Sequence, residues 1–251
     1  MLKKSRLNSI IVIEKNVGDF AMRYENILLD ADGTLLDFLA AEDAAVRETM
    51  SLYGIKPTDE LVAAYSEIND GFWKMLERGE IKREELLYKR FQVFCERFGF
   101  SVDYMKMAAD YRALLRQQGQ LLDGAVNFLQ KLYGKAKLYI VTNGVATTQS
   151  KRIEISGITK YIDEIFISEN LGCEKPDVRY FEKVSEILGG LDKSRTVIVG
   201  DSLTSDIKGG IAFGIDTCWF TPKSKSAPAD MNITCIAKSF DEIFEFLIGE
   251  N

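Results

Sequence analysis

Residues 30–37 read DADGTLLD and directly follow the short apolar run Ile27–Leu29. The run is short enough to be a buried strand, and Gly33 supplies a turn where that strand would end. Asp30 and Asp32 lie two positions apart, so at a strand end they point to the same side of the sheet. Packing gives no reason for two charges there, because paired anions repel each other and resist burial. The stretch therefore predicts either a site for a cation or a phosphoryl group, or an exposed acidic turn.

The rest of the chain divides into a helical block at residues 38–119 and an alternating block from residue 120 onward. In the first, apolar residues at three- and four-residue spacing predict helices at Leu61–Glu77, Glu84–Phe98 and Tyr104–Arg116. In the second, short apolar strands are expected at Lys137–Val141, Glu164–Ile167, Thr196–Val199 and Thr217–Phe220. Helices are expected near Gln149–Ile155, Val178–Leu188, Ser205–Phe213 and Phe240–Ile248. This alternation predicts an α/β fold in which helices flank a parallel sheet that includes the strand Tyr24–Leu29.

Polar residues follow four of the predicted strands, and ligands of open parallel sheets bind outside the carboxyl ends of the strands. These residues are the pair Asp30 and Asp32, the run Thr142-Asn143-Gly144, Lys175, and the pair Asp201 and Asp206. Two carboxylate pairs suit a hard cation with oxygen ligands, which means Mg²⁺ rather than Zn²⁺. A hydroxyl, free backbone amides and a lysine suit a phosphate.

The amino-acid composition excludes several classes of active site and argues against some partners. The 251 residues include no histidine, which excludes Ser-His-Asp triads, Cys-His dyads and HExxH zinc sites. The four cysteines form no CxxC pair, so we expect reduced thiols in a cytoplasmic protein. A net charge of −6 argues against a general nucleic-acid polymer as partner. No apolar run approaches the roughly 20 residues that cross a membrane, and residues 1–21 are interpreted as an N-terminal extension rather than a signal peptide.

The order of these motifs resembles the haloacid dehalogenase (HAD) superfamily of phosphatases. The sequence carries DADGT, TNG, a lysine before a predicted helix, and GDSLTSD, and the resemblance extends over nearly everything from Tyr24 onward. It implies a Rossmann-like core built from residues 22–37 and 120–251, with residues 38–119 inserted as an all-helical C1 cap. Caps of this kind close over the site and contact the leaving group.

The resemblance also implies a role for each motif. Asp30 would attack phosphorus and form an aspartyl-phosphate, and Asp32 would serve as general acid and then as general base. Mg²⁺ would be bound by Asp30, the backbone carbonyl of Asp32, Asp201 and Asp206. Thr142 and the amides of Asn143 and Gly144 would bind phosphoryl oxygens. Lys175 would neutralise the developing charge and orient Asp30.

Two longer stretches, DADGTLLDF at residue 30 and ISENLGCEKPDVRYFEKV at residue 167, resemble the pyrimidine 5′-nucleotidase branch of the capped HAD proteins. That resemblance implies a nucleoside monophosphate as the small-molecule phosphate ester. The protein is expected to be a monomer or a homodimer. Phosphoglycolate phosphatase and sugar-phosphate phosphatase are the alternatives.

Other functional classes have weaker support. Dehalogenases of the superfamily lack the second Asp of the pair, which Asp32 supplies here. No feature indicates a phosphomutase, and a non-catalytic binding protein would be expected to have lost Asp30, Asp32 or Lys175.

Of eight aromatic residues in the helical block, we expect most in its core and one or two at the pocket: Tyr65, Phe72, Trp73, Tyr88, Phe91, Phe94, Tyr104 and Tyr111.

Overall fold

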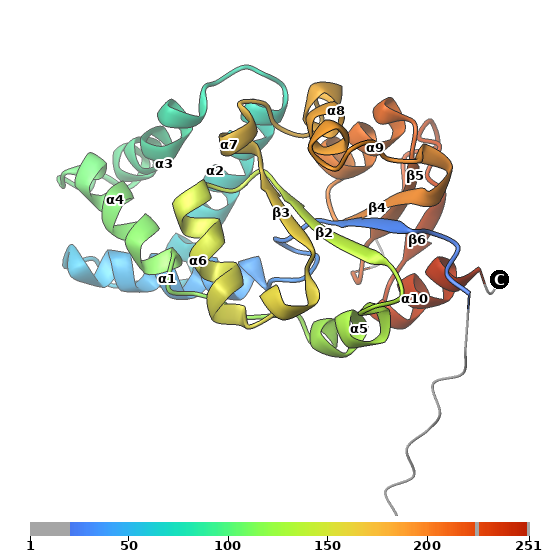
Figure 1. Cartoon of the computed structure of the whole chain (residues 1–251). Coiled ribbons are helices and arrows are strands. Elements are labelled where there is room, and N and C mark those ends of the chain that lie inside the picture. The colour runs from blue at the N-terminus through green and yellow to red at the C-terminus, as the bar shows by residue number, and fades with distance from the viewer. Residues whose placement is uncertain (1–20, 224–225, 250–251) are drawn as a thin grey trace, which may run out of the picture.

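Six parallel strands form one sheet in the order β3-β2-β1-β4-β5-β6 (Figure 1). The computed structural model describes residues 21–223 and 226–249, so the predicted extension at residues 1–21 lies outside the described residues, apart from Ala21. The strands are β1 (Asn26–Leu29), β2 (Lys137–Thr142), β3 (Glu164–Ile167), β4 (Thr196–Gly200), β5 (Asp216–Phe220) and β6 (Cys235–Ala237). Strand β1 is central and pairs with β2 on one side and β4 on the other. The predicted parallel sheet is therefore confirmed, with the acidic stretch next to its middle strand.

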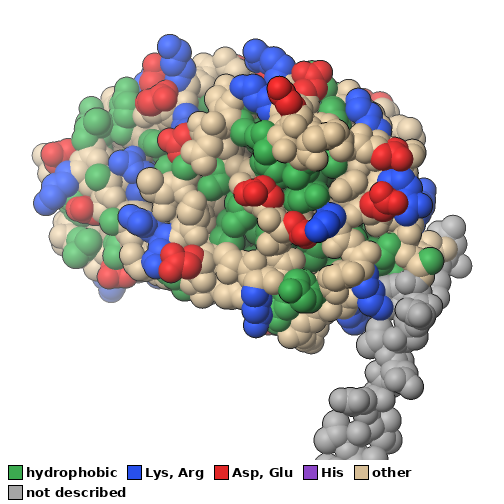
Figure 2. All heavy atoms as spheres, viewed as in Figure 1, with side chains coloured by type: hydrophobic (Ala, Val, Ile, Leu, Met, Phe, Trp, Pro, Cys, Tyr) green, Lys and Arg blue, Asp and Glu red, His purple; other side chains and the backbone are tan. Residues whose placement is uncertain are grey.

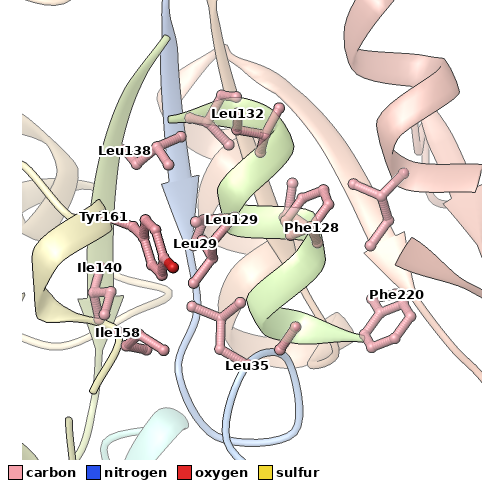
Figure 3. Close-up of a cluster of buried hydrophobic side chains, with 14 of the residues drawn as sticks. Leu29, Leu35, Phe128, Leu129, Leu132, Leu138, Ile140, Ile158, Tyr161 and Phe220 are labelled. Atoms are coloured by element: carbon pink, nitrogen blue, oxygen red, sulfur yellow. The ribbon is translucent and has the colours of Figure 1, made fainter. Parts of the chain in front are cut away.

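Helices cover both faces of this sheet. They are α5 (Ala125–Leu132), α6 (Ala146–Ser156), α7 (Ser168–Leu171), α8 (Val178–Ile187), α9 (Lys208–Phe213) and α10 (Phe240–Ile248). Because side chains alternate along a strand, Leu29 packs toward Phe128 and Leu129 of α5, as Figure 3 shows. Leu28 packs on the other face with Phe181 of α8. Burial on both faces explains why the strands are continuous apolar runs.

The helical block consists of α1 (Phe38–Leu52), α2 (Asp59–Glu77), α3 (Arg83–Phe98) and α4 (Tyr104–Leu115). It lies in the chain between β1 and β2 and gathers to one side of the sheet (Figure 1). It has a core of its own, in which the rings of Tyr65 and Phe91 lie 4.8 Å apart between centroids. Helix α1 was not predicted as a separate segment, because alanines supply much of its buried face and weaken the apolar pattern.

Two neighbouring segments connect the helical block to the sheet. The outgoing segment is residues 35–38, and the returning segment is residues 116–122. The amide of Asp37 donates to the carbonyl of Gln120 at 2.9 Å, and the amide of Leu122 donates to the carbonyl of Leu35 at 2.9 Å. The chain therefore leaves and re-enters the sheet region at one place.

Charged side chains of both signs are spread over the surface that Figure 2 draws. On the face drawn in Figure 2, acidic and basic side chains are interspersed and no large basic patch is visible. Among the helices of the described residues, none is long and apolar enough to cross a membrane.

Candidate active site

One cavity of about 790 Å³ lies between the helical block and the carboxyl ends of β1, β2 and β4. All eight site residues predicted from the sequence line it: Asp30, Asp32, Thr142, Asn143, Gly144, Lys175, Asp201 and Asp206. The fold places them together because each follows or ends a strand, or lies in the segment beyond β3, and the strands are parallel. A cavity of this size is within the range of small-molecule sites, about 300–1,000 Å³.

Three carboxylates form an acidic cluster in this cavity. Asp30, Asp201 and Asp206 each place one oxygen within 4.8 Å of the others. Gly33 permits the close approach: its φ is +82°, and a Cβ atom there would lie 2.6 Å from Oδ2 of Asp201. Burial raises the pKa of Asp30 well above its usual range, and burial with the charge of Asp206 raises the pKa of Asp201 to about 7. A further positive charge beside these carboxyls would favour their ionised forms.

Lys175 is the cation within this cluster. Its Nζ donates to Oδ1 of Asp30 at 2.7 Å, to Oδ1 of Asp206 at 2.6 Å and to the carbonyl of Val141 at 2.7 Å. These three acceptors use every N–H of the ammonium group, whose side chain is only 1% exposed. Burial alone would lower the pKa of Lys175, but the charges of Asp206 and Asp30 outweigh it and raise that pKa. Lys175 is thus held charged beside Asp30.

The loop after β2 combines binding and positioning groups. The side chain of Asn143 accepts from the amide of Lys175 at 2.9 Å and donates to its carbonyl at 2.8 Å, which fixes the lysine backbone. Oγ1 of Thr142 accepts from the Gly144 amide at 3.2 Å and from Nε2 of Gln149 at 3.1 Å. Both acceptor sites of this hydroxyl are then filled, so its own hydrogen is available to an anion in the cavity.

The donor set fits Mg²⁺. It consists of carboxylate oxygens at hard-cation spacing, and none of the clustered residues is a cysteine or histidine that would favour zinc. One lysine also balances only part of the charge of three carboxylates. The carboxylate of Asp32 lies outside this cluster.

The two residues that bind the Asp32 carboxylate are not among those predicted from the sequence. Arg152 donates from Nη1 to Oδ1 of Asp32 at 2.5 Å, and Gln149 donates from Nε2 to Oδ2 at 2.9 Å. Both belong to α6, three residues apart, so they share one helix face. That spacing was visible in the sequence, but nothing local indicates that this face meets the turn after β1.

The helical block contributes the opposite wall. Arg83 donates to the carbonyl of Asn143 at 2.5 Å and to Oγ of Ser168 at 2.8 Å, and Glu77 accepts from Oγ1 of Thr204 at 2.6 Å. These contacts join the helical block to residues that follow β2, β3 and β4 in the chain.

Of the eight aromatic residues considered above, only Trp73 lines the cavity, whereas Tyr65, Phe91, Phe94 and Tyr111 are buried in the block's core. Near Trp73, a buried polar group also lines the cavity: Glu42 accepts from Ser66 at 2.6 Å and from Asn69 at 2.6 Å.

Relatives of known sequence match most of the chain. The HAD-hydrolase YfnB of Bacillus subtilis is 38% identical over 229 residues, which cover 91% of this chain and 97% of YfnB. Pyrimidine 5′-nucleotidase PynA of Streptococcus pneumoniae is 37% identical over 90% of this chain and 96% of its own length. Pyrimidine 5′-nucleotidase YjjG of Escherichia coli is 32% identical over 90% of this chain and 99% of its own length.

Structure and family comparisons agree with these relatives. A crystal structure of YfnB bound to magnesium, described as revealing interdomain movement, matches with a TM-score of 0.85 over 90% of this chain and 99% of that one. The sequence profile of haloacid dehalogenase-like hydrolases matches residues 24–214. The resemblance inferred from the four motifs is confirmed, and the chain belongs to the haloacid dehalogenase-like hydrolase family.

Proposed function

We propose that this protein is a Mg²⁺-dependent phosphomonoester hydrolase that acts through an aspartyl-phosphate on Asp30 and that its substrates are pyrimidine nucleoside 5′-monophosphates. The observation that carries the proposal is the buried Lys175, which joins Asp30 and Asp206 beside Asp201. Such an arrangement holds a carboxylate ready to attack an anionic ester and leaves room for a divalent cation.

Each side chain has a part in the reaction. Asp30 supplies the attacking oxygen, while Lys175 orients that carboxylate and offsets the negative charge that gathers on the phosphoryl group. The free hydrogen of Thr142 is donated to a phosphoryl oxygen. Asp32 carries a proton to the leaving oxygen and later removes one from the attacking water. Mg²⁺, bound by Asp30, the carbonyl of Asp32, Asp201 and Asp206, would reduce the repulsion between carboxylate and phosphate.

The relatives and the cavity support a nucleotide substrate. PynA and YjjG, both named pyrimidine 5′-nucleotidases, match about nine-tenths of this chain. The cavity has the volume for a nucleotide, and Trp73 in its wall offers a ring on which a base can stack. We propose that α1–α4 act as the cap that contacts this leaving group.

A panel of phosphate esters assayed with Mg²⁺ tests the proposed substrate. Uridine and cytidine 5′-monophosphates should give the highest kcat/KM, ahead of phosphoglycolate and hexose phosphates. The proposed substrate would be rejected by turnover confined to phosphoglycolate or a sugar phosphate. Failure to hydrolyse any ester in the panel would count against a phosphatase altogether.

Trp73→Ala should weaken nucleotide binding. Loss of a stacking partner costs about 1–3 kcal/mol per base, so KM for uridine monophosphate should rise about tenfold or more. KM for ribose 5-phosphate, which has no base, should change little. The neighbouring Phe72→Ala is the matched control, because Phe72 does not line the cavity. Equal effects of Trp73→Ala on both substrates would contradict a stacking role.

Mg²⁺ binding should depend on pH through Asp201. This carboxyl, with a pKa raised to about 7, must lose its proton before it can bind a metal. The affinity for Mg²⁺ should therefore fall as the pH drops through that pKa, by up to about tenfold per pH unit. Calorimetric titration of the protein from about pH 8 down to about pH 6 measures the change. An affinity that is constant over this range would contradict the assignment.

A further inference from the structure

Arg152 is a buried arginine whose contacts converge on Asp32. Its side chain is 1% exposed, and Nη1 donates to Oδ1 of Asp32 at 2.5 Å. Burying a guanidinium is costly unless it is paired and hydrogen-bonded, so a fixed role is expected for it. Its other nitrogen, Nη2, is buried and has no hydrogen-bond partner among the described residues. If this position served only to fill space in the core, an apolar side chain would fill it at a lower desolvation cost.

Gln149 is the second residue that binds the Asp32 carboxylate. Nη1 of Arg152 also donates to Oε1 of Gln149 at 3.1 Å, which fixes the orientation of the amide. The amide nitrogen then donates to Oδ2 of Asp32 at 2.9 Å and to Oγ1 of Thr142 at 3.1 Å. Both oxygens of Asp32 are held by specific donors, and each keeps a second lone pair for a proton. The same amide links Asp32 to the hydroxyl expected to bind phosphate.

Arg152 also contacts both segments that connect the helical block to the sheet. Its Nε donates to the carbonyl of Gln118 in the returning segment at 2.9 Å. Its guanidinium carbon lies 5.6 Å from the ring centre of Phe38 in the outgoing segment. A displacement of the helical block relative to the sheet would therefore act on the guanidinium that holds Asp32.

We infer that Arg152 and Gln149 are positioning residues that align Asp32 for proton transfer to the leaving group and couple that alignment to the two connecting segments. The inference rests on the proposed function, since it assigns Asp32 the proton transfer. Misalignment of a reacting group by about 1 Å can cost about 100-fold in rate. The loss should be confined to substrates whose leaving oxygen needs a proton.

Two substrates separate alignment from general damage. The leaving oxygen of uridine monophosphate is a basic alkoxide and needs protonation, whereas the p-nitrophenolate of p-nitrophenyl phosphate leaves without it. The quantity to compare is kcat/KM with Mg²⁺, because it reports the first chemical step. Arg152→Gln should lower kcat/KM for uridine monophosphate by about 100-fold, and that for p-nitrophenyl phosphate by less than about fivefold.

Three further variants complete the test. Arg152→Lys, which keeps the charge, should restore part of the loss on uridine monophosphate. Gln149→Met keeps the volume but removes the donor to both Asp32 and Thr142, so both substrates should be affected, with the larger loss on uridine monophosphate. This difference tests the inference if Arg152→Gln does not fold. Lys151→Gln is the matched control, because Lys151 pairs with Glu154 and does not line the cavity, so its loss should leave both values unchanged.

The inference is overturned if folded Arg152→Gln and Gln149→Met lose activity equally on both substrates, or lose none. A wild-type protein that hydrolyses neither ester would instead overturn the proposed function, so the two failures are distinguishable.

Discussion

Asp30→Asn should abolish Mg²⁺-dependent phosphate release, lowering kcat by about 10⁴-fold or more, because an amide oxygen is a poor nucleophile and the covalent step is lost. Asp30 lies at the end of the central strand, and its Oδ1 is fixed by Lys175 at 2.7 Å. Steady-state phosphate release from uridine monophosphate, with folding checked by circular dichroism, measures the effect.

A control variant on the same part of the chain is Asp43→Asn. Asp43 is partly exposed on α1 and pairs with Arg47, so its loss should leave turnover close to that of the wild type. Deamidation of the new asparagine regenerates some wild-type protein. Turnover in Asp30→Asn above the level that this contaminant explains would show that Asp30 is not the nucleophile.

Lys175→Met should have the second largest effect, because it removes activity and stability together. The change leaves Asp30 and Asp206 buried without their cation, and breaking a buried ion pair from one side costs about 3–5 kcal/mol. Turnover should fall by about 10³-fold, since the charge that gathers on the phosphoryl group is no longer offset. Thermal unfolding without metal and steady-state kinetics with Mg²⁺ measure the two losses separately.

The stability loss of Lys175→Met should grow with pH. Burial already raises the pKa of Asp30, and Lys175 opposes that rise, so removal of the lysine raises the pKa further. A carboxyl whose pKa is raised in the folded state is destabilising once it ionises, so the variant should be most stable at low pH and lose stability as pH rises.

A second substitution distinguishes charge imbalance from simple damage. Lys175→Met combined with Asp206→Asn removes one of the two unpaired carboxylates and should recover part of the stability without recovering turnover. A double variant as unstable as Lys175→Met would contradict the electrostatic account. Wild-type turnover in either variant would show that Lys175 has no role in catalysis.

The sequence predicted most of the site because each functional group is tied to a strand end. Asp30, Thr142 and Asp201 directly end or follow short apolar runs, and parallel strands bring such ends to one edge of the sheet. Lys175 does not itself end a strand, but its position could be predicted because it lies beyond β3 and precedes a recognisable helix. No such rule applies to Arg152 and Gln149. Helical periodicity shows that they share a face, but only the packing of α6 beside the turn after β1 shows what that face contacts.

Weak local patterns explain the elements that were missed. Strand β6 contains only Cys235–Ala237, too short to show alternation, and its place beside β5 follows from tertiary packing. The helix predicted at Ser205–Phe213 begins instead as a π-helical turn, Leu203–Ile207, in which Ser202 caps the start and the buried Asp206 faces Lys175. A polar residue buried for its function breaks the apolar period on which such predictions depend.

A phosphoryl group carried covalently on Asp30 can be trapped directly. Asp32→Asn should still transfer phosphate from p-nitrophenyl phosphate, whose leaving group needs no acid, but should hydrolyse the enzyme-bound phosphate slowly for lack of a base. The measurement is peptide mass spectrometry of this variant, quenched in acid after mixing with the ester and Mg²⁺. We predict one added phosphoryl group, located on Asp30. Nitrophenol release with no phosphoryl group on the protein, or with the group on another residue, would contradict the account.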